Sequence, residues 1–325
     1  MLMKIRKEYF ILLAIVIALA LYLIFHTTDK TNYTLPKIPR ISKKEISKVE
    51  ISKQGASILL NKGDNKWCIA PREYPADTNK INNILGVIAK LTLTALVSES
   101  KNYNRYDLDK DKKITVKAWT GDELMREFEL GKTASSYRHT FIKIAGDDGV
   151  YHALENFRDK FDITVDKLRD KTVLSFDKNE IRKISITKEK QSAVFTLKEP
   201  PVKVKTVEKA DAPINLSPKD AFWEGPEGKK ADESKLNRLL STLSTLRCQK
   251  YVDNGKKTDF TKPIYTLQLK GPKEYSLSIF AEKDKDAKEY PAVSSENDYP
   301  FFLSKTQADN IMKDPDELVK KQEKD

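Results

Sequence analysis

The chain has 325 residues, a third of them charged, and a formal net charge of +11. This length is enough for two ordinary domains with buried cores. The lysines are spread through the whole chain rather than gathered beside aromatic residues. The composition therefore argues against a nucleic-acid-binding protein and indicates a lysine-rich, solvated surface.

An uncharged apolar run from Tyr9 to Phe25 predicts a membrane-spanning helix close to the N-terminus. As a helix, the run would span about 25 Å, close to the hydrocarbon thickness of a bilayer. Lys4, Arg6 and Lys7 precede it and predict a cytoplasmic N-terminus. We therefore expect a single-pass protein of the inner (cytoplasmic) membrane, anchored by 1–26, with most of the chain extracytoplasmic, in the periplasm.

A cleaved signal peptide is the alternative to this anchor. Ala18-Leu19-Ala20 is a triplet of the kind that signal peptidases cleave, but apolar residues follow it up to Phe25. Cleavage there would leave an apolar N-terminus, which favours an uncleaved anchor. Because no cysteine stands near the end of the run, a bacterial lipoprotein anchor is excluded.

A polar stretch with prolines at 36 and 39 follows, and we interpret 27–44 as an extended extracytoplasmic spacer. A first repeat, 45–170, then opens with two strand-like runs, ISKVEIS and ASILLNK, joined by a turn at Gln54-Gly55. Asp77 has the short carboxylate of a helix N-cap. The residues after it form one apolar stripe at helical spacing, Ile81, Ile84, Leu85, Ile88 and Leu91. Further strand-like runs complete the repeat.

A second repeat, 171–312, follows the same plan. IRKISIT and SAVFTLK replace the first hairpin, Asp232 takes the place of Asp77, and five leucines replace the apolar stripe, Leu236, Leu239, Leu240, Leu243 and Leu246. A helix with one apolar stripe buries it most simply on a sheet. The predicted fold class is therefore α+β: an N-terminal transmembrane helix, then two tandem similar units, each a mainly antiparallel sheet with one packed amphipathic helix. We expect an inserted loop or hairpin between 199 and 218, and a charged C-terminal tail, 313–325.

Six residues mark corresponding positions in the two repeats, Trp67, Pro71, Asp77, Trp223, Pro226 and Asp232. A tryptophan beside a loop could anchor a binding partner. Because both repeats keep the tryptophan close to a proline and to the helix start, we favour a structural role, with the ring packed over the beginning of the helix.

The two cysteines, Cys68 and Cys248, make no metal-binding pattern. Outside the cytoplasm they could form one disulfide. Two buried free thiols are the alternative, and the sequence leaves both open.

No group of residues predicts catalysis or cofactor binding. Gly131-Lys132-Thr133 resembles the end of a phosphate-binding loop, but that motif needs a glycine where Arg126 stands. His26, His139 and His152 lack metal-ligand spacing. The acidic stretch from 106 to 111 lacks the central glycine and the terminal glutamate of a calcium loop. We expect no enzyme activity, no cofactor, no metal and no small-molecule substrate.

The doubled pattern resembles a bacterial family of envelope proteins known as "domain of unknown function 4340". The residues that carry the resemblance are Trp67 with Pro71, Ala76-Asp77, Leu130-Gly131, Leu168 to Phe176 at the join, Trp223, Pro226 and Ala231-Asp232. One departure is Tyr106-Asp107-Leu108, where the family pattern has Tyr-Gly-Leu. The resemblance implies an outward-facing, membrane-anchored protein that often accompanies ABC-type components similar to gliding-motility auxiliary proteins.

These observations together predict an accessory or scaffold protein. We expect a non-catalytic subunit of an ABC-transporter-associated envelope complex, held in the membrane by Tyr9 to Phe25 and bound to a protein partner. A module that binds an envelope glycan or another anionic polymer through its lysines is the alternative.

Overall fold

The computed structural model describes residues 7–25, 33–64, 66–189, 191–199, 221–252, 254–282 and 288–320, without the side chains of 7–10 and 23–25. The chain forms two compact units. Unit 1 comprises Met1–Lys62 and Asn82–Asp162, and unit 2 comprises Gly63–Ile81 and Ile163–Asp325. These units are discontinuous along the chain, whereas the predicted repeats are continuous, and the repeat boundaries stay a prediction.

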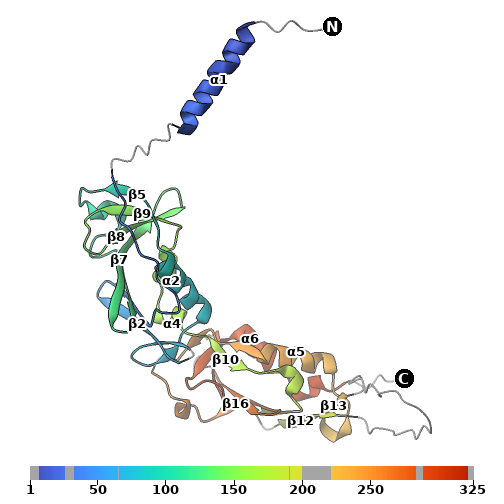
Figure 1. Ribbon diagram of the computed structural model, residues 1–325. Helices are drawn as coiled ribbons and strands as arrows, with labels where there is room; N and C mark the ends of the chain where they lie inside the picture. The colour runs from blue at the N-terminus through green and yellow to red at the C-terminus, as the bar shows by residue number, and fades with distance from the viewer. Residues whose placement is uncertain are drawn as a thin grey trace, which may run out of the picture. The chain divides into compact units, whose positions relative to one another are not determined.

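An antiparallel sheet forms the body of unit 1 (Figure 1). Its strands lie in the order β2-β1-β6-β7-β8-β9-β5, so β5 occupies one end. Their bounds are β1 (Lys48–Lys53), β2 (Ala56–Lys62), β5 (Leu93–Ser98), β6 (Ile114–Thr120), β7 (Glu123–Thr133), β8 (His139–Ile144) and β9 (Val150–Leu154). Alternate residues are buried, as Val49 and Ile51 are on β1, because successive side chains of a strand point to opposite faces.

The turn between β1 and β2 confirms the hairpin predicted at Gln54-Gly55. Lys53 pairs with Ala56, so the loop consists of Gln54 and Gly55, whose φ angles are 52° and 79°. Two consecutive residues with positive φ make the type of turn whose twist matches an antiparallel hairpin.

Helix α2 (Thr78–Lys90) supplies the predicted apolar stripe of the first repeat. Ile81, Ile84, Leu85 and Ile88 are each at most 4% exposed, and Leu91 just after the helix is 7% exposed. Burial of such a side chain contributes about 1.5–3 kcal/mol. Residues 82–90 of the helix belong to unit 1, together with the short elements η1 (Tyr103–Tyr106) and α3 (Arg158–Phe161).

The main sheet of unit 2 is also antiparallel, with the order β13-β12-β11-β16-β17-β18-β19-β15. Its strands are β11 (Lys183–Lys188), β12 (Gln191–Lys198), β13 (Phe222–Glu224), β15 (Lys250–Tyr251), β16 (Pro263–Lys270), β17 (Glu274–Phe280), β18 (Glu289–Ser294) and β19 (Phe301–Ser304). From β12 to β15 this order matches the order of unit 1 strand for strand, with β15 at the position of β5.

Helix α5 (Glu233–Leu243) supplies four of the five leucines of the stripe predicted for the second repeat, whereas the fifth, Leu246, is buried on β14 (Thr245–Arg247). Leu236, Leu239, Leu240 and Leu243 join one buried cluster with residues of the main sheet such as Phe195 and Leu267. The other elements of unit 2 are β3 (Trp67–Ile69), β4 (Tyr74–Pro75), α4 (Val165–Leu168), β10 (Thr172–Ser175), β14 (Thr245–Arg247), α6 (Lys305–Ile311) and the 3-10 turns η2 (Lys178–Glu180), η3 (Pro226–Gly228), η4 (Lys257–Asp259) and η5 (Pro315–Leu318). The predicted α+β class with mainly antiparallel sheets is confirmed.

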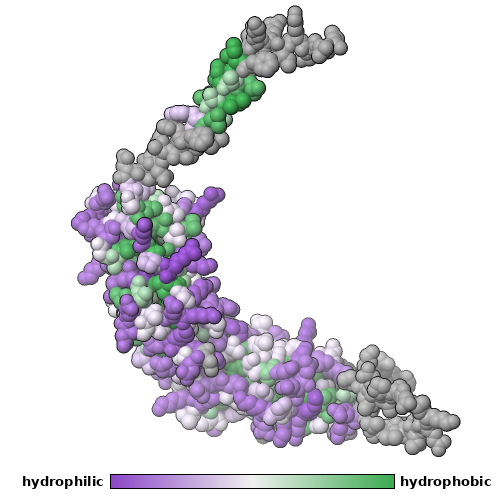
Figure 2. Space-filling view, viewed as in Figure 1, coloured by the Kyte–Doolittle hydropathy of each residue, from purple (hydrophilic) through white to green (hydrophobic). Residues whose placement is uncertain are grey.

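The N-terminal run forms helix α1 (Lys7–Phe25). Figure 2 shows its apolar residues in green. Within the ranges of the chain given above, no helix is both long and apolar enough to cross a membrane. Outside the described residues lie His26, Lys4 and Arg6, residues 27–32 of the predicted spacer, 200–218 of the insertion predicted between 199 and 218, and 321–325 of the predicted tail.

Candidate functional site

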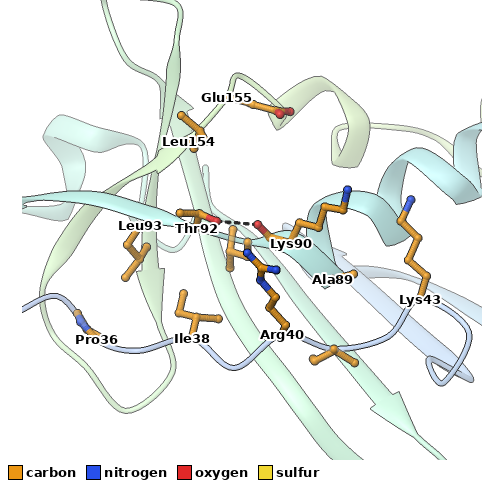
Figure 3. A pocket seen from close by; sticks show the side chains of 12 residues that line it. Pro36, Ile38, Arg40, Lys43, Ala89, Lys90, Thr92, Leu93, Leu154 and Glu155 are labelled. Carbon is orange, nitrogen blue, oxygen red and sulfur yellow. Dashed lines mark hydrogen bonds between the residues drawn. The ribbon is translucent and has the colours of Figure 1, made fainter.

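A groove of about 670 Å³ lies in unit 1, where the chain before β1 runs past the end of α2 and the start of β5 (Figure 3). One side is formed by residues 36–43 and the other by Leu154 and Glu155 after β9. Ala89 to Leu93, which connect α2 to β5, also line it. The volume falls in the range that ordinary ligand pockets have.

A buried arginine holds the first side of the groove in place. Arg126 on β7 is 7% exposed, and its guanidinium donates hydrogen bonds to the carbonyl oxygens of Pro39 and Ile88. Ile41 adds a backbone bond to the carbonyl of Ala89 at 3.5 Å. Burial lowers the pKa of Arg126, and the charge is stabilised by both carbonyls, of which that of Ile88 lies at the negative end of the α2 dipole. Residues 36–43 of the predicted spacer are therefore packed against the rest of unit 1.

The opposite side of the groove is fixed by a strained turn. Glu155 has φ of 75°, a conformation that side chains other than glycine rarely adopt. The buried Thr140 holds this turn, because its hydroxyl donates to the carbonyl of Glu155 at 3.0 Å and accepts from the backbone N–H of Phe157 at 3.2 Å. The turn leaves Leu154 50% exposed beside the groove. Such strain is common where a surface is shaped for binding.

The rim of the groove is positively charged. Arg40, Lys43 and Lys90 line it, and among the described residues none of these three forms an ion pair. Lys43 donates only to the carbonyl of Asn82 at 3.4 Å. Its ammonium lies over Gly86, where an added Cβ would come within 3.1 Å of it. Glu155 is the one acidic residue of the lining, and Lys160 lies 3.9 Å from its carboxylate.

The lining combines apolar and cationic contacts. Ile41, Ala89 and Leu91 make a buried apolar base, with Ile38 and Leu93 half-exposed beside them. The residues that line the groove include no histidine, cysteine or serine, and the Thr92 hydroxyl donates to the carbonyl of Lys90 at 2.9 Å. This arrangement suits the binding of a molecule that carries both apolar groups and negative charge.

The predicted repeat-signature residues lie elsewhere, in unit 2. Asp77 caps α2, because its carboxylate accepts from the N–H groups of Asn79 and Lys80 at 3.0 and 3.2 Å. Asp232 caps α5 and accepts from Lys235 at 3.1 Å. Pro71 is exposed, and Pro226 begins η3.

The tryptophans occupy matched positions before these caps. Trp223 is 6% exposed, while Trp67 is half-buried. The carbonyl of Trp67 accepts from Ala76, and that of Trp223 accepts from Ala231, both at 2.9 Å. These backbone bonds join each tryptophan to the residue before the cap, and the packing of the rings over the helix start stays a prediction.

Cys68 and Cys248, both in unit 2, are free cysteines in the structure. Burial raises the pKa of both thiols, that of Cys248 to about 11. Two free thiols are one of the alternatives that the sequence left open.

The remaining motifs have structural explanations. An added Cβ on Gly131 would lie 2.1 Å from the carbonyl oxygen of Tyr106, so this glycine permits β7 to approach η1 closely. Asp107, which departs from the family pattern, has φ of 55°, a conformation that glycine adopts without cost.

His139 and His152 are brought together on neighbouring strands, with ring centroids 5.1 Å apart, which the sequence analysis did not predict. The described part of the chain holds no group of three or more His, Cys, Asp or Glu residues that could bind a metal.

The groove was not predicted from the sequence, although one residue carried a signal. Phe128 and Leu130 alternate as buried residues on β7, so the same alternation places Arg126 on the buried face. A charged residue at such a position needs partners, and these are carbonyls from two distant segments. The unpaired cations of the rim had no comparable signal in a chain rich in lysine.

Comparison with known proteins gives one result. The family model "Domain of unknown function (DUF4340)" matches residues 67–268. No curated protein and no solved structure matches the chain.

Proposed function

Because the chain belongs to the family "Domain of unknown function (DUF4340)", we propose that it is a membrane-anchored, extracytoplasmic accessory or scaffold protein. In this proposal it is a non-catalytic subunit of an ABC-transporter-associated envelope complex, and it works by binding a protein partner. The groove of unit 1 is the observation that carries the proposal.

The groove has the properties of a binding surface that is ready before the partner arrives. Arg126 and Thr140 hold its two sides in place. An interface benefits from such rigidity, since little conformational entropy is lost on association. The half-exposed Leu154 offers apolar contact, and the unpaired cations offer charge.

The proposed membrane anchor is the run from Tyr9 to Phe25. Along the part of α1 whose side chains are described, large apolar side chains are 47–62% exposed, namely Ile11, Leu12, Leu13, Ile15, Val16, Ile17, Leu19, Leu21 and Tyr22. A helix that is apolar all round requires an apolar environment. The bases before the run favour a cytoplasmic N-terminus in the inner membrane, with the rest of the chain in the periplasm.

In-cell photo-crosslinking of the full-length protein tests this proposal. A crosslinking amino acid is placed at Leu154 beside the groove and, as control, at Tyr137, which is 78% exposed in the loop between β7 and β8. We expect a discrete protein adduct from position 154, identified by mass spectrometry as an ABC-type membrane component. No adduct from position 154 beyond that from position 137 would contradict the proposal.

The unpaired cations of the rim also favour a second candidate, a module for an envelope glycan or another anionic polymer. Binding of this kind weakens as salt screens the charges. Titration of the full-length protein with an anionic polysaccharide at low and high ionic strength tests it. Absence of binding at low ionic strength would exclude this candidate.

A further inference from the structure

We propose that the groove receives an extended segment of the partner protein, rich in acidic and apolar residues, which adds to the sheet of unit 1 as a strand beside β5. This inference rests on the proposed function and specifies the chemistry of the partner. It depends on the edge of the sheet, the position of the groove and the charge of the rim.

The edge of β5 is the first of these observations. β5 is the last strand of its sheet and pairs with β9. Within the described residues no strand pairs with its other edge, so backbone donors and acceptors there are available. The strand runs Leu-Thr-Ala-Leu-Val-Ser, without a charge or a proline.

Natural proteins protect edge strands with β-bulges, charges, prolines or short length. The edge of β5 has two register shifts against β9, but it is six residues long and lacks the protection of charge, proline or short length. The corresponding edge of the unit 2 sheet has this protection, since β15 consists of only Lys250 and Tyr251. The contrast indicates that the edge of β5 is left open for a partner, and an added strand is a common way to bind an extended peptide.

The groove continues this edge. Leu93 is the first residue of β5 and lines the groove, and Figure 3 shows it beside Ile38 and Pro36. An extended segment that pairs with β5 would therefore enter the groove at one end. Alternate side chains of the segment would meet the apolar base of the groove.

The rim selects for negative charge. Arg40, Lys43 and Lys90 line the same groove as Leu93, the first residue of β5, and Glu155 is the one acid in that lining. An anionic lipid headgroup could also neutralise these cations. A headgroup would not pair with the backbone edge of β5, however, and for this reason the observations favour a peptide.

A direct binding measurement tests the inference. The full-length protein is placed in phosphatidylcholine nanodiscs, and a labelled synthetic peptide in which Glu alternates with Val is titrated by fluorescence anisotropy. We expect affinity to fall about tenfold in the variant Arg40→Gln/Lys43→Gln/Lys90→Gln. The control variant Arg105→Gln/Lys110→Gln/Lys132→Gln removes the same charge from exposed positions of unit 1 outside the groove, and it should bind normally.

A second peptide separates strand addition from simple charge attraction. Methyl groups on alternate backbone nitrogens remove the N–H donors of one edge, hinder the approach of that edge to a neighbouring strand and keep every charge. We expect this peptide to lose binding. Equal affinity for both peptides, equal loss in both variants, or binding to phosphatidylglycerol vesicles without binding to the peptide would each overturn the inference. If the crosslink from position 154 persists while the peptide test fails, the accessory function stands and only the acidic strand is excluded.

Discussion

Two aspartates show how single side chains position the helices of this fold. Besides capping its helix, Asp77 donates its backbone N–H to the carbonyl of Leu168, and Asp232 donates its own to the carbonyl of Leu318, both at 2.8 Å. Each aspartate thus joins a helix start to a segment that follows the last strand of its repeat. The sequence predicted the caps, because capping is local, but not these second partners.

We expect Asp232→Ala to lower the free energy of unfolding of unit 2 by about 1 kcal/mol, because the N–H of Lys235 loses its acceptor. Hydrogen bonding from this N–H also holds the pKa of Asp232 below its ordinary value. The contribution of this cap to the stability of unit 2 is therefore present above about pH 4, and it is lost as the pH falls through the lowered pKa of Asp232. Thermal unfolding followed by circular dichroism checks the loss, and Asp232→Asn, which keeps an acceptor, should lose less.

The stacked histidines predict a second pH dependence. Burial, and then the charge of His139, lower the pKa of His152 below its ordinary value of 6.5. The unfolded chain binds this proton at a higher pH than the folded chain does, so stability decreases as the pH falls below about 6.5. We expect His152→Phe, which keeps an aromatic ring, to flatten the dependence of melting temperature on pH between about 7 and 5.5. An unchanged slope would show that the pair does not contribute.

At the scale of elements, Arg126 holds residues 36–43 in place as one side of the groove. It joins β7, the end of α2 and the segment before β1 through two charge-assisted hydrogen bonds. No other described side chain donates to the carbonyls of Pro39 or Ile88.

Arg126→Leu should therefore release this segment and lower the free energy of unfolding of unit 1 by about 2–3 kcal/mol. Limited digestion with trypsin, with cleavage after Lys37 and Arg40 measured by mass spectrometry, should become faster. Arg126→Lys keeps the charge but lacks the several N–H donors of a guanidinium, and its rate of cleavage should be intermediate. Cleavage as slow as in the wild type would mean that other contacts hold the segment.

Helices α2 and α5, their caps and the hairpin turn were predictable from the sequence because their signals are local, whereas α3, α4 and α6 were not predicted. The apolar stripes at helical spacing and Gln54-Gly55 are such signals. The position of β5 at the end of the sheet was not predictable, since it depends on pairing with β9 more than fifty residues away. The groove was hidden for the same reason. In the sequence, the first side of the groove looks like a polar spacer. This segment packs on the rest of unit 1 through Arg126, and Arg126 and the two carbonyls it binds come from three separate parts of the chain.

At the scale of the whole molecule, two sheets share one strand order but end differently. The edge at β15 is short and basic, whereas the edge at β5 is longer, uncharged and continuous with a groove. In the proposed account, both repeats supply a stable fold, and the first repeat carries the surface that binds the partner. The apolar run at the N-terminus would hold that surface close to the membrane.

The stoichiometry of the complex purified from cells tests this account most directly. The full-length wild type, the groove variant Arg40→Gln/Lys43→Gln/Lys90→Gln and the control variant Arg105→Gln/Lys110→Gln/Lys132→Gln are each purified in mild detergent and quantified by mass spectrometry. The account predicts ABC-type membrane subunits at a fixed ratio with the wild type and the control, and their loss from the groove variant. A wild-type protein that purifies alone, or a groove variant that retains the subunits at the wild-type ratio, would contradict it.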